Sequence, residues 1–258
     1  MSRQIVVGDI HGCFYTFEAL LKDIGFSAHE DQLYLLGDII GKGLHSDLVL
    51  DFCMSLPFCR IVLGNHDLSW MNAYSLPSYD AMHQEVFKAR QDFSNLLNHK
   101  RASLWFDFLS QQRFMLNEAF GILVHAAVDP SWTEKELEDI DQWLVSDMQV
   151  DPVRFFSQVS APKVNKWHDE LSEAEKRYMA IQILTRARYY ASNQELALNT
   201  HGPPEEHSNL EPWYMIDRRI EKPIWFGHWA SLKGKAIPNA YHLDGGAVYG
   251  GILIAQEV

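Results

Sequence analysis

Short apolar runs that end in glycine recur along the chain, and they limit the folds that it can adopt more than any other feature. The first run, 5–7, is β-branched and is followed by apolar residues at helical spacing up to Gly25. The pattern returns at 33–36, with a helical stretch over 47–55, and again at 61–63. A strand followed by a helix, repeated in this way, predicts an α/β fold with loops at the strand ends.

Helical patterning dominates the middle of the chain, from about 68 to 110 and again from about 132 to 190. Within the second region, Ser172 and Glu175 fit the capping box that opens a helix. Further strand-like runs lie at 122–124, 223–226, 240–243 and 248–254. Because no repeat, low-complexity tract or clean linker divides the chain, we expect a single domain over 1–258 with helical insertions at roughly 68–110 and 132–190.

Charge and cysteine usage exclude several classes of protein. The 34 acidic side chains against 22 Lys and Arg give a formal charge of −12, which argues against binding nucleic acid through a broad basic face, so an anionic substrate must be held locally. Three cysteines without a CxxC pair disfavour a disulfide framework and a thiolate zinc site. With no signal-peptide layout and no long apolar stretch, we expect a cytoplasmic protein that has no membrane or protein partner.

Polar clusters follow the predicted strands at the points where they end. Three begin with glycine and cover 8–12, 37–43 and 64–67, while His125 and His228 each follow a further apolar strand. Ligands bind at the carboxyl ends of the strands in α/β sheets, so we expect these five strand ends to converge. Together they supply carboxylate, imidazole and amide oxygen donors.

These donor types and their spacing predict a site for two metal ions. Asp9 and His11 leave one face of an extended backbone and can chelate one ion. Asp38 can bridge two ions held about 3.5 to 4 Å apart, as two-metal hydrolases require. The second ion would be held by Asp38 with three further side chains, Asn65, His125 and His228. Nitrogen and oxygen donors without thiolate suit Mn, Fe, Co or Zn rather than calcium.

Each of these signals also has an ordinary structural explanation. A lone Asp-x-His is common by chance, a Gly-Asp pair often marks a turn, Asn65 could form an Asx turn, and Asp67 could cap the next helix. A lone His125 or His228 is more often a core or surface histidine. The conjunction of five strand ends, each with a donor that one site needs, favours the metal site. The other eight histidines lack this setting, and we assign them no role.

The ordered segments GDIHG, GDIIGKG, GNHD, VHAAV and FGHWA resemble the signature of the calcineurin-type metallophosphoesterases. Within that superfamily, less general segments resemble the bacterial symmetrical dinucleoside tetraphosphatases, and the resemblance runs from about Ile5 to Ile254. These segments are 184–188, 212–214, 226–235, 243–246 and 250–251.

This resemblance implies the calcineurin-like α/β fold, a two-layer β-sandwich core flanked by helices (α/β/β/α). It also implies two divalent transition-metal ions, with Mn or Co as the first choice and Fe or Zn as alternatives. The implied partner is a small molecule, a dinucleoside polyphosphate. The implied reaction is symmetrical cleavage of diadenosine tetraphosphate to two ADP.

The resemblance also suggests catalytic roles outside the metal ligands. His66 is expected to face the phosphate and to stabilise charge or protonate the leaving oxygen, with Asp67 as a weak candidate to orient it. Lys42, Arg186 and Arg188 are expected to clamp the phosphates, although cations at a helix end are also favoured by the helix dipole. Four aromatic side chains are candidate platforms for adenine, with core packing as the default: Trp213, Tyr214, Trp225 and Trp229.

Three departures from the family pattern keep other functions open. Lys42 stands where the family usually has Arg and supplies a point charge without the bidentate fork. Gly41 stands where the related protein phosphatases have Asp, and Ala127 stands where Gly is usual. The alternatives are a broader phosphatase acting on proteins, nucleotides or polyphosphate, and a metal-binding regulatory module that has lost catalysis. Gly41 argues against a protein phosphatase, and the intact ligands argue against the regulatory module.

Overall fold

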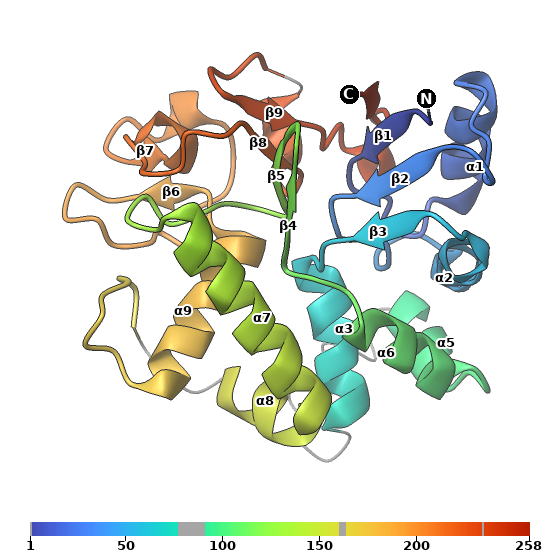
Figure 1. The fold of residues 1–258 in the computed structure, drawn as a ribbon, viewed down its shortest axis with the longest axis horizontal. Helices are drawn as coiled ribbons and strands as arrows, with labels where there is room; N and C mark the ends of the chain where they lie inside the picture. Colours follow the sequence, from blue (N-terminus) through green and yellow to red (C-terminus); the bar gives the residue numbers. More distant parts are fainter. Residues whose placement is uncertain (1, 77–90, 160–163, 234) are drawn as a thin grey trace.

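The computed structural model describes residues 2–76, 91–159, 164–233 and 235–258, and two four-stranded sheets dominate it (Figure 1). The first sheet has the order β10-β1-β2-β3, in which β1, β2 and β3 are parallel and β10 is antiparallel to β1. Its strands are β1 (Gln4–Val7), β2 (Gln32–Leu35), β3 (Cys59–Ile61) and β10 (Ala255–Glu257). Because β1 pairs with β10, the two ends of the described chain lie side by side.

The second sheet has the order β4-β5-β8-β9, in which β5, β8 and β9 are parallel and β4 is antiparallel to β5. Its strands are β4 (Met115–Glu118), β5 (Gly121–Val124), β8 (Ile224–Phe226) and β9 (Ala240–His242). A short pair, β6 (Tyr189–Tyr190) and β7 (Glu211–Pro212), stands apart from both sheets.

The two sheets pack face to face through one buried apolar cluster. Val6, Tyr34, Leu36 and Val62 come from the first sheet or its strand ends, and the second sheet contributes Leu116, Leu123, Trp225 and Leu243. The alternating inward positions of strands from both sheets therefore form the inner layer of a two-layer sandwich. The predicted fold class is confirmed.

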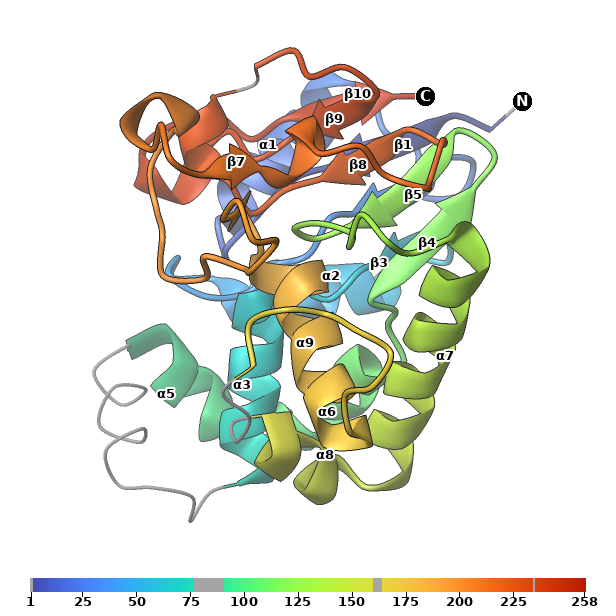
Figure 2. The ribbon, with the colours of Figure 1, turned by 90° about the vertical axis from the view of Figure 1, so that its left-hand side faces the viewer.

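Helices surround the sandwich and place most of the remaining apolar surface in one continuous core. In Figure 1, α1 and α2 lie beside β1–β3, and the helices from α3 to α9 gather below both sheets. Figure 2 shows α7 and α9 side by side beneath the strands. The helices are α1 (Phe14–Asp23), α2 (Ser46–Ser55), α3 (Asn65–Ser75), α5 (Gln91–Leu97), α6 (Ala102–Ser110), α7 (Glu134–Val150), α8 (Pro152–Val159) and α9 (Glu173–Arg186).

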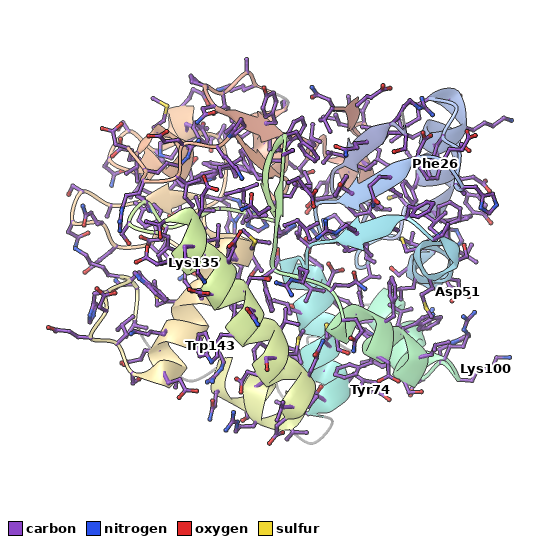
Figure 3. The ribbon with its side chains drawn as sticks, viewed as in Figure 1. Phe26, Asp51, Tyr74, Lys100, Lys135 and Trp143 are labelled. Carbon is purple, nitrogen blue, oxygen red and sulfur yellow. The ribbon has the colours of Figure 1, made fainter. Side chains whose placement is uncertain are left out.

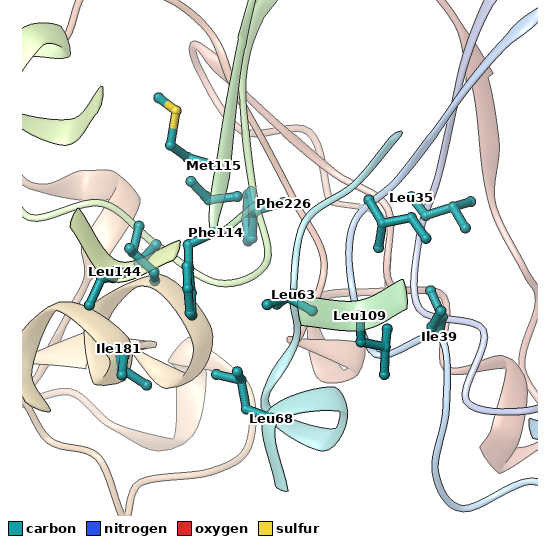
Figure 4. Packing of buried hydrophobic residues seen from close by; sticks show 14 of the residues in the cluster. Leu35, Ile39, Leu63, Leu68, Leu109, Phe114, Met115, Leu144, Ile181 and Phe226 are labelled. Carbon is teal, nitrogen blue, oxygen red and sulfur yellow. The ribbon is translucent and has the colours of Figure 1, made fainter. Parts of the chain in front are cut away.

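This core joins the helices to the strands. Leu68 of α3, Leu109 of α6, Leu144 of α7 and Ile181 of α9 are buried together with strand residues such as Phe226 (Figure 4). The helix ends and loops that follow the strands are thereby fixed to a rigid scaffold.

Local sequence signals explain how two of the helices begin. Ser172 accepts a hydrogen bond from the Glu175 backbone, and the Glu175 carboxylate accepts one in return, so the predicted capping box is present. Thr133 and Glu136 form a second box at the start of α7. The outward face of α7 carries Lys135, which is paired with Asp139 and is 75% exposed (Figure 3). No helix in the described ranges is long and apolar enough to cross a membrane.

The expected strand over 248–254 is wrong. A 3₁₀ turn occupies Ala247–Tyr249, and the strand that returns to the first sheet begins only at Ala255. Gly246 and Gly250 adopt positive φ angles of 69° and 84°, which bend the chain out of the extended conformation. The apolar residues of this segment therefore line a loop rather than a sheet.

Replacement of Asp141 by alanine tests how α7 is held to the sheet. Its buried carboxylate accepts hydrogen bonds from the backbone of Phe114 (2.7 Å) and Met115 (3.1 Å), and it also pairs with Arg113. Because the substitution leaves buried donors unpaired, we expect it to lower the free energy of unfolding by about 3 kcal/mol, measured by chemical denaturation. Asp139→Ala, on the exposed face of the same helix, should leave the midpoint almost unchanged. Equal effects of the two substitutions would contradict this role.

Candidate active site

Residues that follow the carboxyl ends of β1, β2, β3, β8 and β9 line one cavity of about 360 Å³. The sequence predicts the first four of these ends; the fifth end that it predicts, that of β5, carries His125, and nine of the eleven predicted site residues line the cavity. These nine are Asp9, His11, Lys42, Asp38, Asn65, His66, Arg186, Arg188 and His228. The remaining two, His125 and Asp67, have no exposed surface.

Tight turns at the strand ends bring these side chains together. His11, Asp38 and His228 all have positive φ angles, of 48°, 46° and 61°. Two of the loops also approach each other so closely that a Cβ on Gly64 would lie 2.2 Å from Asp38 Oδ1. Glycine is therefore required at this crossing of the second and third motifs.

Asp38 lies between two groups of donor atoms. Its Oδ2 is 3.5 Å from His11 Nε2 and also 3.5 Å from His125 Nε2. On the second side, His125 Nε2 is 3.3 Å from Asn65 Oδ1, and the donor atoms of Asp38, His125 and His228 lie within 4.8 Å of one another. One carboxylate is thus within reach of two neighbouring cation positions, as a bridging ligand must be.

On the His11 side of Asp38, the structure brings His66 close, which the sequence does not suggest as a metal ligand. Donor atoms of His11, Asp38 and His66 lie within 4.8 Å of one another. Asp9 Oδ2 is 3.9 Å from His11 Nε2, and both Asp9 oxygens accept hydrogen bonds from the His228 backbone, at 3.0 and 3.2 Å. Asp9 therefore also ties the first motif to the last.

Backbone carbonyls orient the histidine rings of this centre. Leu36 O lies 2.6 Å from His125 Nδ1, and Ile40 O lies 3.4 Å from His11 Nδ1. A carbonyl oxygen only accepts, so each Nδ1 donates to its carbonyl, and Nε2 is the nitrogen that each ring turns toward Asp38. In His228 the two nitrogens exchange roles: Nε2 lies 3.2 Å from Arg186 O, and Nδ1 is the nitrogen left for the site.

The electrostatics of the centre favour cation binding. Burial lowers the pKa of His11 to about 4, and burial together with nearby Arg188 lowers the pKa of His228 well below its ordinary value. Both imidazoles are therefore neutral, which is the form that binds metals. Burial and then the neighbouring Asp244 raise the pKa of Asp9 well above its ordinary value. The positive charges of the protein do not fully balance these clustered carboxylates, and divalent cations would do so.

Asp38 and His125 form the most tightly coupled pair of the centre. Burial disfavours the charged form of both, but His125, His66 and His11 together hold the pKa of Asp38 well below its ordinary value. The Asp38 carboxylate in turn raises the pKa of His125 to about 10, against the effect of burial. The bridging position is thus held by an ionised carboxylate, and the residues present fit a pair of divalent ions.

His66 and Asp67 lie in the first turn of α3, and His66 lines the cavity. The His66 backbone donates to Asp38 Oδ1 at 2.7 Å, and its ring meets the ring of His11 edge-on with centroids 4.7 Å apart. The Asp67 carboxylate accepts the backbone N–H groups of Gly64 (2.8 Å) and Ile40 (3.3 Å). The bond from Gly64, the N-cap residue of α3, belongs to the helix cap, and the bond from Ile40 joins the second motif to the third.

The side chains of the predicted phosphate clamp come from two parts of the chain. Lys42 follows Asp38 and lies on the His11 side, where its ammonium contacts the hydroxyl of Tyr249. On the His228 side, Arg188 donates to the His228 carbonyl at 3.0 Å, and Arg186 closes α9. Cationic side chains therefore lie near both groups of metal-binding donors, Lys42 near His11 and Arg188 near His228.

Several residues that line the cavity were missed by sequence reasoning. Asp244 follows β9 as the other donors follow their strands, and that signal was available. His201 and Tyr249 lie in loops without a motif. Of the four candidate adenine platforms, only Trp229 lines the cavity described here, and it is 2% exposed.

The sequence profile of a family described as calcineurin-like phosphoesterase matches residues 2–231. This chain belongs to the calcineurin-like phosphoesterase family. It is therefore a metallophosphoesterase, a hydrolase that uses divalent metal ions, and the expectation of an enzyme of this type is confirmed.

Curated relatives and solved structures agree with this membership. The chain is 31% identical to "Bis(5'-nucleosyl)-tetraphosphatase, symmetrical" of Proteus mirabilis, over 96% of this chain and 91% of the relative. It is 33% identical to the protein of the same name in Pectobacterium carotovorum, over 96% and 89% of the two chains. A solved structure provisionally assigned as a diadenosine tetraphosphatase superposes with a TM-score of 0.58 at 22% identity, covering 99% and 93% of the two chains. A protein-tyrosine phosphatase of Shewanella shares the fold, with a TM-score of 0.53 at 12% identity over 99% and 75%.

The glycine of the second motif gives a sharp test of how this phosphoesterase positions His66. Gly41 has a φ of 105°, and a Cβ there would lie 2.6 Å from His66 Nδ1. We expect Gly41→Ala to displace the ring and to lower kcat about a hundredfold, because displacements of about 1 Å have effects of that size. Gly25→Ala is the matched control, since Gly25 also has positive φ but a Cβ there meets nothing within 4 Å. If both variants kept wild-type kcat, the space that Gly41 leaves for the His66 ring would not matter for catalysis.

Proposed function

We propose that this phosphoesterase hydrolyses diadenosine tetraphosphate symmetrically to two ADP, using two divalent ions with Mn or Co as the first choice. The observation that carries the proposal is that Lys42, Arg186 and Arg188 line the same cavity as the two groups of metal-binding donors. A tetraphosphate attacked at an inner phosphorus leaves a diphosphate arm on each side of the metal centre. Lys42 would hold one arm and the two arginines the other.

The names of the curated relatives support the same substrate and the same position of the broken bond in the tetraphosphate. They are symmetrical tetraphosphatases that align with 96% of this chain at 31% and 33% identity. The proposal includes a small-molecule substrate as the partner and a cytoplasmic location, which fits a nucleotide substrate.

The metal-binding roles follow the strand ends. We assign one ion to Asp9, His11 and Asp38, and the second to Asp38 with Asn65, His125 and His228. When bound, the two ions supply Lewis-acid charge stabilisation and a nucleophilic water. Asp38 is shared between them because its Oδ2 lies 3.5 Å from a histidine nitrogen on each side.

The remaining side chains act on the phosphates. The oxygen of the attacking water forms a bond to an inner phosphorus, and the bond from that phosphorus to the central bridging oxygen breaks. His66 would give its proton to the departing oxygen, so that one ADP leaves directly and the other carries the new oxygen. Lys42, Arg186 and Arg188 would hold the non-bridging oxygens and offset their negative charge.

The test is to incubate the chelator-treated protein with diadenosine tetraphosphate, with and without added Mn or Co, and to separate the products by chromatography. We expect ADP as the sole nucleotide product and no reaction before metal is restored. ATP with AMP would show that the proposed register is wrong. Turnover of a generic aryl phosphate without any cleavage of the tetraphosphate would favour the broader phosphatase.

A further inference from the structure

Tyr249 contacts the phosphate clamp from a distant part of the chain. It is 207 residues from Lys42 in sequence, yet its hydroxyl contacts the Lys42 ammonium, which lies 4.6 Å from the centroid of its ring. Both side chains line the cavity. Tyr249 is 66% exposed, so burial in the core does not explain its position.

The loops that carry these two side chains are both fixed at the site. The Gly43 backbone donates to His11 O at 2.8 Å, which holds the Lys42 loop against the first motif. On the other loop, the Gly246 backbone donates to Asp244 Oδ1 at 2.9 Å, and Gly251 donates to Gly246 O at 3.0 Å. The contact therefore joins two anchored loops that both leave strand ends facing the cavity.

The hydroxyl of Tyr249 supplies a hydrogen-bond donor on a second atom, which Lys42, unlike an arginine, lacks. A lysine ammonium is a point charge on a flexible stem, whereas an arginine presents two donors in a planar fork. A tyrosine hydroxyl can accept a hydrogen bond from the ammonium and still donate its own proton. With Tyr249 beside it, Lys42 is held in place, and two donors on different atoms face the same side of the cavity.

We propose that Lys42 and Tyr249 form a two-donor clamp for a phosphate group on the His11 side of the metal centre, an inference that rests on the proposed function for the identity of the substrate. The ammonium and the phenol each donate to a non-bridging phosphate oxygen. Tyr249 is thus a substrate-binding residue and also positions Lys42.

The experiment compares Tyr249→Phe in two backgrounds, the natural chain and Lys42→Arg. Tyr249→Phe keeps the ring and removes the hydroxyl, so we expect a rise of about tenfold in the KM for diadenosine tetraphosphate, the size of one hydrogen bond to a charged group. With arginine at position 42, the guanidinium supplies both donors, and the same substitution should change KM less than about threefold. Tyr241→Phe is the matched control, because Tyr241 is also exposed but stacks on Trp225 away from the cavity.

Equilibrium binding of inorganic pyrophosphate to the manganese-loaded protein provides a readout that does not need turnover. Tyr249→Phe should weaken this binding about tenfold, and Tyr241→Phe should not change it. A Tyr249→Phe protein whose KM and pyrophosphate affinity both stay within twofold of wild type would overturn the clamp, as would an equal loss in the Lys42→Arg background. If the wild-type protein cleaves no tetraphosphate, the proposed function fails while the pyrophosphate comparison still decides on the clamp.

Discussion

Replacing Asp38 by asparagine is expected to lower the hydrolysis of diadenosine tetraphosphate about a thousandfold or more and to reduce the amount of bound metal. Its Oδ2 is the atom shared by the two donor groups, at 3.5 Å from His11 and from His125. An amide is neutral, so its oxygen binds a cation much more weakly than a carboxylate oxygen does and offsets none of the charge of two cations. The loss of several kcal/mol of charge stabilisation corresponds to a rate effect of this size.

The control for this substitution is Asp129→Asn. Asp129 is also buried and hydrogen-bonded, to the backbone and hydroxyl of Ser131, but it does not line the cavity. Steady-state rates should be measured together with metal content by elemental analysis. Retention of two ions and of near-normal kcat in Asp38→Asn would contradict the bridging role.

Replacing His66 by asparagine is expected to lower kcat by about a hundredfold to ten-thousandfold while leaving metal content unchanged, because general acids contribute on that scale. The loss should shrink with an aryl phosphate, whose leaving group needs less assistance from an acid. The result also decides between two roles, since the donor atoms of His66 lie within 4.8 Å of those of His11 and Asp38. Loss of one bound ion in His66→Asn would make it a ligand instead of an acid. His29→Asn, at an exposed position, is the control.

The strand ends of the site were predictable because their signals are local. A short apolar strand, a glycine and a polar donor lie together in sequence, and parallel strands bring such triplets to one edge. The same rule applies to Asp244, which follows β9. The sequence also suggests Asp67 as the N-cap of the next helix, whereas Gly64 is the N-cap of α3 and Asp67 accepts its N–H from within the first turn.

Long-range contacts were not predictable in the same way. The approach of Tyr249 to Lys42 depends on a bend at Gly246 and Gly250, which the apolar pattern of 248–254 concealed. The hydrogen bonds from the His228 backbone to Asp9 depend on the packing of two sheets, which no pattern within either strand encodes. Single-sequence patterns therefore place donors at an edge, whereas the packing of the sandwich decides their partners.

The cavity gathers cationic side chains although the chain as a whole is acidic. The formal charge is −12, yet Lys42, Arg186 and Arg188 all line one cavity. Three buried carboxylates, Asp9, Asp38 and Asp244, line it as well. In the proposed function, the three cations hold the phosphate chain and Asp9 and Asp38 hold metal ions, so no basic surface elsewhere is needed.

The most direct test of the central claim is hydrolysis of diadenosine tetraphosphate in ¹⁸O-labelled water by the manganese-loaded protein, with the products weighed by mass spectrometry. Attack of water on an inner phosphorus with release of the central bridging oxygen predicts that ADP is formed and that one of every two ADP molecules carries a single ¹⁸O on its terminal phosphate. Formation of ATP and AMP would place the broken bond between an inner and an outer phosphorus, with the label in ATP for attack on the inner one and in AMP for attack on the outer one, and would contradict the symmetrical cleavage proposed for this site.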